Sequence, residues 1–188
     1  MKHGALLLLY LALSLAPAGA RVDSPRTELG HGYAMLHEAL SQFRHLDLAV
    51  WLKHEDASVT RLLESLAETA EAHRRTLEEL ASASPTIDLD NQGLTRFELE
   101  KRRALIVHRG LQLGTPLIGE TGPRMERQTL LSLAAAINQQ RFLIQVMREE
   151  EPIAARRDWL DGLKADLDRL HGEYEALLAK RYFAAPAD

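Results

Sequence analysis

Apolar residues recur every three or four positions through four long stretches of this chain, and that spacing constrains its fold more than any other feature. The period matches the 3.6 residues of an α-helical turn and places the apolar side chains on one face. A helix of this kind needs a neighbour against which to bury its face. The pattern therefore predicts an all-α protein with helices over 25–53, 57–82, 123–149 and 152–181.

The predicted core is the set of side chains that follow these steps along each helix. The first two helices contribute Leu29, Tyr33, Leu36, Leu40, Phe43, Leu46, Val50, Val59, Leu62, Leu66, Ala70, His73, Leu77 and Leu80. The last two contribute Leu130, Leu133, Ile137, Ile144, Met147, Ile153, Leu160, Leu163, Leu167, Leu170, Tyr174 and Leu177.

Local signals mark where the first two helices begin. Pro25 suits the first helical position, where its missing N–H is not needed. Asp56 can cap the second helix, and the residues from Lys53 to Ser58 include no apolar side chain larger than alanine. These features favour a break between two helices. One continuous helix stays open as the alternative, because Leu52 and Val59 are seven positions apart.

Three further connections join the predicted helices. Residues 83–93 are rich in turn-forming types, and a shorter helix is expected over 95–113 behind the capping-box sequence of Thr95 and Glu98. Residues 114–123 have the composition of a loop. Glu149, Glu150 and Glu151 are expected to form a solvated turn whose charges favour the start of the last helix.

The first twenty residues have the three parts of a signal peptide. Lys2 is positively charged, 5–15 form an apolar run, and 18–20 form an A-x-A cleavage site. The run is shorter than the roughly 20 apolar residues that span a bilayer, although a retained anchor is the alternative. The sequence thus predicts a signal peptide over 1–20, one helical-bundle domain over 21–183 and a disordered tail over 184–188.

Composition limits the compartment and the partners of the mature chain. The sequence contains no cysteine, which excludes disulfides and a lipid anchor. Cleavage after residue 20 removes one lysine and leaves 168 residues with a net charge of −5, whereas nucleic-acid binding demands a basic face. We expect a soluble periplasmic or extracellular protein with no later transmembrane segment and no nucleic-acid partner. An unidentified protein partner or a homodimer is compatible with the long stripes.

The order of the helices predicts a particular topology. Two helical hairpins, 25–82 and 123–181, are joined by some forty residues that include one shorter helix. Matching arms and a long crossover predict an up-down four-helix bundle of two long hairpins. This layout resembles the ferritin-like bundles, and it also resembles uncharacterised exported bacterial helical domains. The resemblance covers most of the mature chain but rests on helix layout alone.

The resemblance to ferritin-like proteins implies a metal centre of carboxylates and histidines. Such a centre takes one glutamate from each of two helices and an E-x-x-H motif from each of the other two. Here Glu28 and His31 form the only E-x-x-H, in the first helix, and the last helix carries a D-x-x-H of Asp168 and His171. The ligand set of the family is therefore not reproduced.

Three histidines on three helices form a weaker candidate site. Counting back from turns near 55 and 151 places His37, His73 and His171 at about the same height in the predicted bundle. A common layer would be a candidate transition-metal or proton-sensing site. The alternative is that each histidine is a core or boundary residue bonded to its own neighbour.

No catalytic motif is present in the sequence. The chain has no thiol nucleophile and no G-x-S-x-G, and the glycines of 114–123 lack the GK[ST] ending of a phosphate-binding loop. We therefore expect a structural or binding module of the cell envelope that is not an enzyme and needs no cofactor. A ferritin-like metal-binding bundle is the alternative function.

Overall fold

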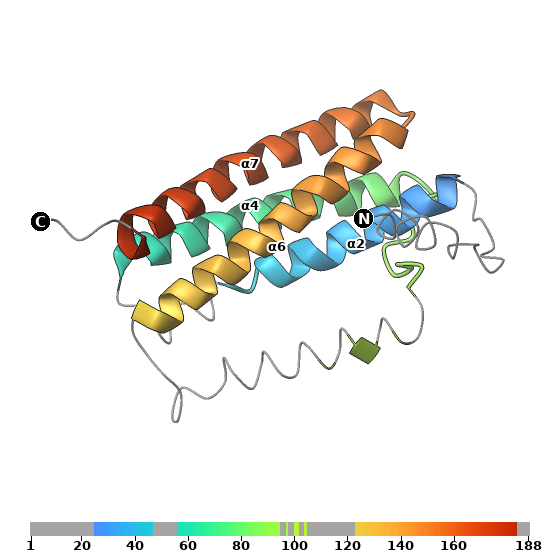
Figure 1. Ribbon diagram of the computed structural model, residues 1–188. Helices are drawn as coiled ribbons and strands as arrows, with labels where there is room; N and C mark the ends of the chain where they lie inside the picture. The colour runs from blue at the N-terminus through green and yellow to red at the C-terminus, as the bar shows by residue number, and fades with distance from the viewer. Residues whose placement is uncertain are drawn as a thin grey trace, which may run out of the picture.

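The computed structural model of the protein describes residues 25–46, 56–94, 97, 100, 101, 104 and 123–183. Regular structure within these ranges is entirely helical, which confirms the predicted all-α class. The predicted signal peptide and the predicted tail lie outside the described residues. The long helices in Figure 1 are α2 (Pro25–Phe43), α4 (Ala57–Ser82), α6 (Pro123–Glu150) and α7 (Ala154–Tyr182).

Helix α2 begins at Pro25 as predicted but ends at Phe43, well before the predicted end at Lys53. The amide of His45 donates to the carbonyl of Gln42, and this three-residue spacing is tighter than that of an α-helix. The predicted end is wrong because the apolar spacing continues past the residue at which the backbone turns. The rest of the predicted segment, 47–53, lies outside the described residues.

Helix α4 begins where its capping signal predicts. Asp56 has an extended backbone, with φ of −89° and ψ of 117°. Its side chain accepts hydrogen bonds from the amides of Ser58, at 2.7 Å, and Val59, at 3.3 Å. These bonds satisfy two N–H groups that have no partner in the first helical turn. The cap confirms the predicted break, and the alternative of one continuous helix is wrong.

The four helices share one hydrophobic core built from most of the predicted stripe residues. Small departures occur on α4, where Leu63 is buried and Leu62 only partly so, and before α7, where Ile153 is exposed. The largest fully buried side chains are Tyr33, Tyr174, Leu36, Leu40, Leu63, Leu66, Leu77, Leu130, Ile137, Ile144, Leu160 and Leu163. The periodicity of the sequence therefore identified the buried faces correctly.

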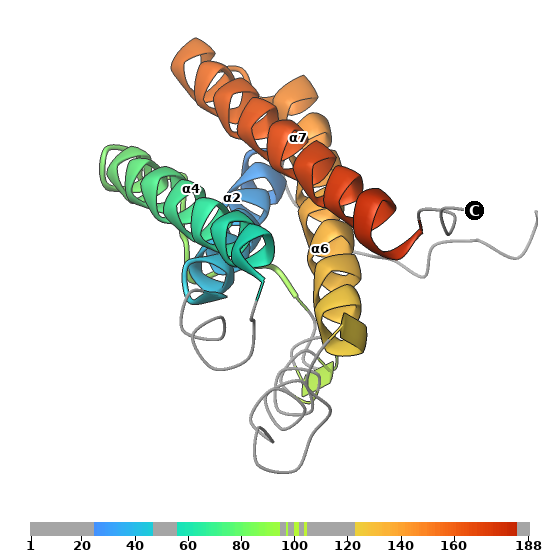
Figure 2. The same ribbon diagram turned by 90° about the vertical axis from the view of Figure 1, so that its left-hand side faces the viewer.

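The helices pack as a bundle in which α6 contacts α7 and α2, while α4 contacts α2 and α7. Figure 1 shows α2 and α7 running in one direction and α4 and α6 in the other. In the view of Figure 2, α7 crosses α6 and lies above α4, and it contacts both helices. Interhelical pairs such as His37 with Glu78 and Arg44 with Glu71 follow this sense, since one number rises as the other falls.

The connection after α4 is a series of turns, as predicted for residues 83–93. Ile87 is buried at 7% exposure and anchors this loop to the core. Of the shorter helix predicted over 95–113, the structure describes four residues, all in helical conformation: Phe97, Glu100, Lys101 and Ala104. The remainder of that prediction, and the predicted loop that follows it, lie outside the described residues.

None of the helices in the described ranges combines the length and the apolar character that a membrane span requires.

We predict that the cap of α4 contributes about 1 kcal/mol to the free energy of unfolding. Asp56→Ala removes both the cap and the ion pair that Asp56 forms with Arg181. Asp56→Asn keeps a capping oxygen and removes only the charge, so it is the matched control. Urea denaturation followed by circular dichroism should show a larger loss for the alanine variant. Equal losses in both variants would assign the effect to the ion pair instead.

Candidate functional site

Glu151 lies in the α6–α7 turn, and its side chain is inaccessible to solvent. The prediction of a solvated acidic turn is therefore wrong for this residue. The Tyr33 hydroxyl donates to Glu151 Oε2 at 2.7 Å, and the Ile153 amide donates to Oε1 at 2.9 Å. A buried carboxylate is tolerated only where such donors replace water, and here one of them comes from a helix distant in sequence.

Arg156 completes this buried cluster. Its guanidinium lies 3.9 Å from Glu151 Oε2 and 6.0 Å from the centre of the Tyr33 ring, and it also donates to the Ser84 hydroxyl. Burial and the hydrogen bond to Glu151 raise the pKa of Tyr33 far above its ordinary value, so the phenol stays protonated. We call Tyr33, Ser84, Glu151 and Arg156 the Glu151 clamp. It joins α2, the loop after α4, the α6–α7 turn and the start of α7.

A second buried carboxylate, Glu126, lies at the opposite end of the bundle. Tyr182 donates to Glu126 Oε2 at 2.8 Å, and Arg181 lies 2.9 Å from the same oxygen. Arg181 also pairs with Asp56, the cap of α4. Burial and the hydrogen bond to Glu126 raise the pKa of Tyr182. This Glu126 clamp (Asp56, Glu126, Arg181 and Tyr182) ties the starts of α4 and α6 to the end of α7.

An aromatic side chain extends the Glu151 clamp towards the middle of the bundle. The Trp159 ring lies 6.1 Å from that of Tyr33 and 6.2 Å from that of His73. The buried Nε1 of Trp159 has no hydrogen-bond acceptor within the described part of the chain. His73 Nε2 is 2.9 Å from Asp166 Oδ2, across the α4–α7 contact.

The three candidate histidines do not share a site. His73 pairs with Asp166, whereas His37 Nε2 lies 3.1 Å from Glu78 and His171 Nδ1 lies 3.6 Å from Glu175. Among the residues that the structure describes, no three histidine or acidic side chains are placed to hold a metal ion together. Each of the three histidines thus lies next to a different carboxylate. Metal binding, ferritin-like or otherwise, stays an untested prediction.

The residues of the E-x-x-H and D-x-x-H motifs lie in different surroundings. Glu28 is exposed at the start of α2, and His31 is partly buried against the loop after α4. Asp168 faces α6, where it pairs with Arg141, and it also accepts from Lys164 at 2.8 Å. Burial opposes ionisation of Asp168, but these two hydrogen bonds outweigh it and lower its pKa. Asp168 is therefore part of the α6–α7 contact.

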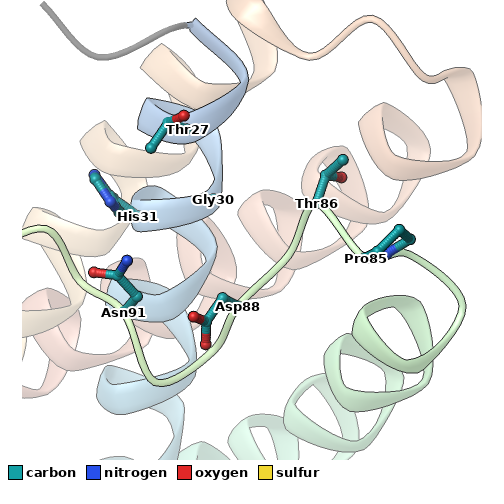
Figure 3. Close-up of a pocket in the computed structure, with 7 residues that line it drawn as sticks. All are labelled: Thr27, Gly30, His31, Pro85, Thr86, Asp88 and Asn91. Carbon is teal, nitrogen blue, oxygen red and sulfur yellow. The ribbon is translucent and has the colours of Figure 1, made fainter.

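A small open hollow of about 240 Å³ lies between α2 and the loop, and Figure 3 shows its lining. Gly30 lets the loop approach, since a Cβ there would lie 3.0 Å from the Thr86 carbonyl oxygen. Gly93 has a positive φ of 62° and packs against the His31 ring. The Asn91 side chain accepts a hydrogen bond from the Gly93 amide, so its oxygen stabilises the loop.

A polar belt follows the outer surface where α2 meets α4. Arg74 donates to both Glu71 and Glu78 on its own helix, while His37 of α2 and Arg44, just after α2, pair with these carboxylates. Hydrogen bonds from Arg74 and Arg75 lower the pKa of Glu71 to about 2. Hydrogen bonding from His37 is the main cause that lowers the pKa of Glu78. A wider open hollow beside the belt is lined by Arg44, His45, Glu64, Ala67, Glu68, Glu71, Ala72 and Arg75.

The outer surface of α6 is different in kind. Leu131, Phe142 and Val146 are 45%, 61% and 62% exposed, and Ala135 between them is also exposed. At 100° per residue these four side chains lie within an arc of about 60° on one side of the helix. We call them the α6 apolar face. Clustered exposed apolar side chains of this kind mark sites of interaction.

Comparison with protein families, with curated proteins and with solved structures found no match to this chain.

Sequence reasoning missed both clamps and the α6 apolar face. The clamps combine residues far apart in sequence, and the separation of Tyr33 from Glu151 is 118 positions. A signal for the α6 face was present, because Leu131, Phe142 and Val146 lie off the predicted inward stripe of that helix. Large apolar residues on a second face of a helix indicate a second contact.

We predict that Tyr33→Phe lowers the free energy of unfolding by about 1–3 kcal/mol, because it leaves a buried acceptor on Glu151 without its donor. In a Glu151→Met background the same substitution should cost much less, since the acceptor is already gone. Urea denaturation of the four proteins gives the coupling energy.

Tyr174→Phe is the control for this cycle. Tyr174 is as buried as Tyr33, but its hydroxyl donates to the Leu62 carbonyl over a longer distance of 3.3 Å. Removal of the Tyr174 hydroxyl should lower the free energy of unfolding by the same amount with and without Glu151. Equal coupling of both tyrosines to Glu151, or no coupling of Tyr33, would contradict the role given to the clamp.

Proposed function

We propose that this chain is an exported, non-catalytic helical module that acts in the cell envelope by binding a protein partner. The observation that carries the proposal is the contrast between its interior and the surface of α6. The buried carboxylates bond to residues of other helices. The α6 apolar face, in contrast, exposes Phe142 and Val146 to water.

Each half of this contrast supports a binding role. Groups already engaged in interhelical bonds hold the helices together, so the described interior is suited to stability. Large apolar side chains in water carry an unfavourable hydration free energy of about 25 cal/mol per Å² that burial against a partner removes. The partner surface is therefore expected to be apolar where it meets α6.

The architecture that we propose for the module is the up-down four-helix bundle of two hairpins and a crossover. The antiparallel contacts of α2 with α4 and of α6 with α7 support the two hairpins. Because α4 and α6 run in the same direction, the chain between them has to return along the length of the bundle. A crossover of some forty residues, 83–122, is long enough for that return.

The proposal of export depends on the leader sequence over residues 1–20. We predict that the protein produced from its full gene begins at Arg21 when it is recovered from the periplasm or the medium. Intact-mass and N-terminal analysis measure this directly. Ala18→Leu combined with Ala20→Leu should block processing, because both positions require small side chains. Recovery of an unprocessed Met1 protein from the cytoplasm would contradict export.

The proposed binding role predicts contacts at the α6 apolar face in intact cells. A photo-crosslinking amino acid in place of Phe142 should give specific adducts, which mass spectrometry identifies. The same amino acid in place of Ala176, an exposed residue of α7, is the matched control. Adducts of Phe142 with a second copy or with an identified envelope protein support the proposal. Equal yields at both positions would count against it.

A further inference from the structure

The α6 apolar face has a symmetric pattern. Leu131 and Val146 are equally far from the midpoint between Asn138 and Gln139, and so are Ala135 and Phe142. A second copy of α6, turned end for end about that midpoint, would thus bring Leu131 level with Val146 of the second copy. Ala135 would lie level with Phe142 of the second copy. A small residue beside a large one allows two helices to pack closely.

Uncharged polar side chains lie on the same side of α6, between the four residues of the α6 apolar face and next to them. Gln128, Asn138 and Gln139 lie along the same side of α6. The intervening Arg141 pairs with Asp168 of α7 and also donates to Asn138 Oδ1 at 2.9 Å, so its charge is already paired within the chain. From Gln128 to Phe142 the face therefore carries no unpaired charge that antiparallel self-packing would have to desolvate.

Charged residues at the two ends of α6 complement each other in the same arrangement. Arg127 lies near the start of the face and Glu149 near its end, and both are exposed. In an antiparallel pair, Arg127 of one copy and Glu149 of the other differ in height along the helix by one residue position. They also lie along the same edge of the contact. A twofold axis generates this pair of opposite charges twice. A parallel pair would instead place each charge beside its own kind.

We propose that the chain forms a twofold-symmetric homodimer through the outer face of α6, with the two copies of α6 antiparallel and centred between Asn138 and Gln139. The proposal deepens the binding role above by naming a second copy as the partner. The face from Gln128 to Glu149 extends for about 32 Å, at 1.5 Å per residue. One helix from each copy gives an interface at the small end of the stable range, so association should depend on concentration.

The absence of cysteine from the sequence gives a direct test of the arrangement. In the proposed dimer the two copies of residue 139 differ in height by about 1.5 Å, whereas the two copies of residue 128 are about 30 Å apart. Under mild oxidation Gln139→Cys should form an intermolecular disulfide and Gln128→Cys should not. Crosslinking of both variants to the same extent would overturn the antiparallel arrangement, and crosslinking of neither would overturn the dimer.

Sedimentation equilibrium over a series of concentrations tests the dimer without covalent crosslinking. The full mature chain should associate reversibly, and Phe142→Glu should weaken association at least about tenfold while its helix content is retained. Ala176→Glu places the same charge on an exposed position of α7 and should leave association unchanged. Arg127→Glu should weaken the dimer, and adding Glu149→Arg should restore it.

A chain that stays monomeric at every concentration would overturn the homodimer. If photo-crosslinking at Phe142 then captures a different, identified envelope protein, the binding role survives and only the identity of the partner is wrong. If neither experiment finds a contact at this face, both proposals fail. The two failures are therefore distinguishable.

Discussion

Burial of a glutamate at each end of the bundle constrains how the four helices fit together. An ionised carboxylate removed from water loses several kcal/mol of solvation unless hydrogen-bond donors replace it. Glu151 accepts hydrogen bonds from the Tyr33 hydroxyl and the Ile153 amide. Glu126 accepts one from the Tyr182 hydroxyl and pairs with Arg181. Stripes of leucine can slide past each other by a turn and stay apolar. Sliding α2 by one turn, about 5.4 Å, would separate the Tyr33 hydroxyl from Glu151, so the clamps fix the register.

The need of buried polar groups for a partner also explains the pairing of other polar side chains near the core. His73 lies on a mostly apolar stripe, and Asp166 of α7 provides its partner. His37 pairs with Glu78 across the α2–α4 contact, and His171 lies 3.6 Å from Glu175 on its own helix. A shared ligand centre requires several such groups to converge. In this bundle His37 and His73 lie in two different helix contacts, and His171 pairs within α7.

The surface of the described bundle has a charged side and an apolar side. Ion pairs around Arg74 line the contact between α2 and α4 with charged side chains. Helix α6 contacts α7 and α2 with one side and exposes Phe142 and Val146 on the other. The apolar residues on this second side of α6 are the basis of the contact that we propose. The symmetric arrangement of those residues is what directs our proposal towards a second copy of the chain.

Local sequence patterns were enough to predict the all-α class, the inward face of each helix, the cap at Asp56 and the turns of 83–93, because each depends on residues within a few positions of one another. They failed at the end of α2 and at Glu151. A helix end can depend on the neighbours of that turn, and the burial of Glu151 depends on a tyrosine 118 positions away. Local spacing fixes which side of a helix is apolar, but only the packed helices decide which polar groups meet. That is why the clamps, the separate histidine pairs and the exposed α6 apolar face were decided by the tertiary structure.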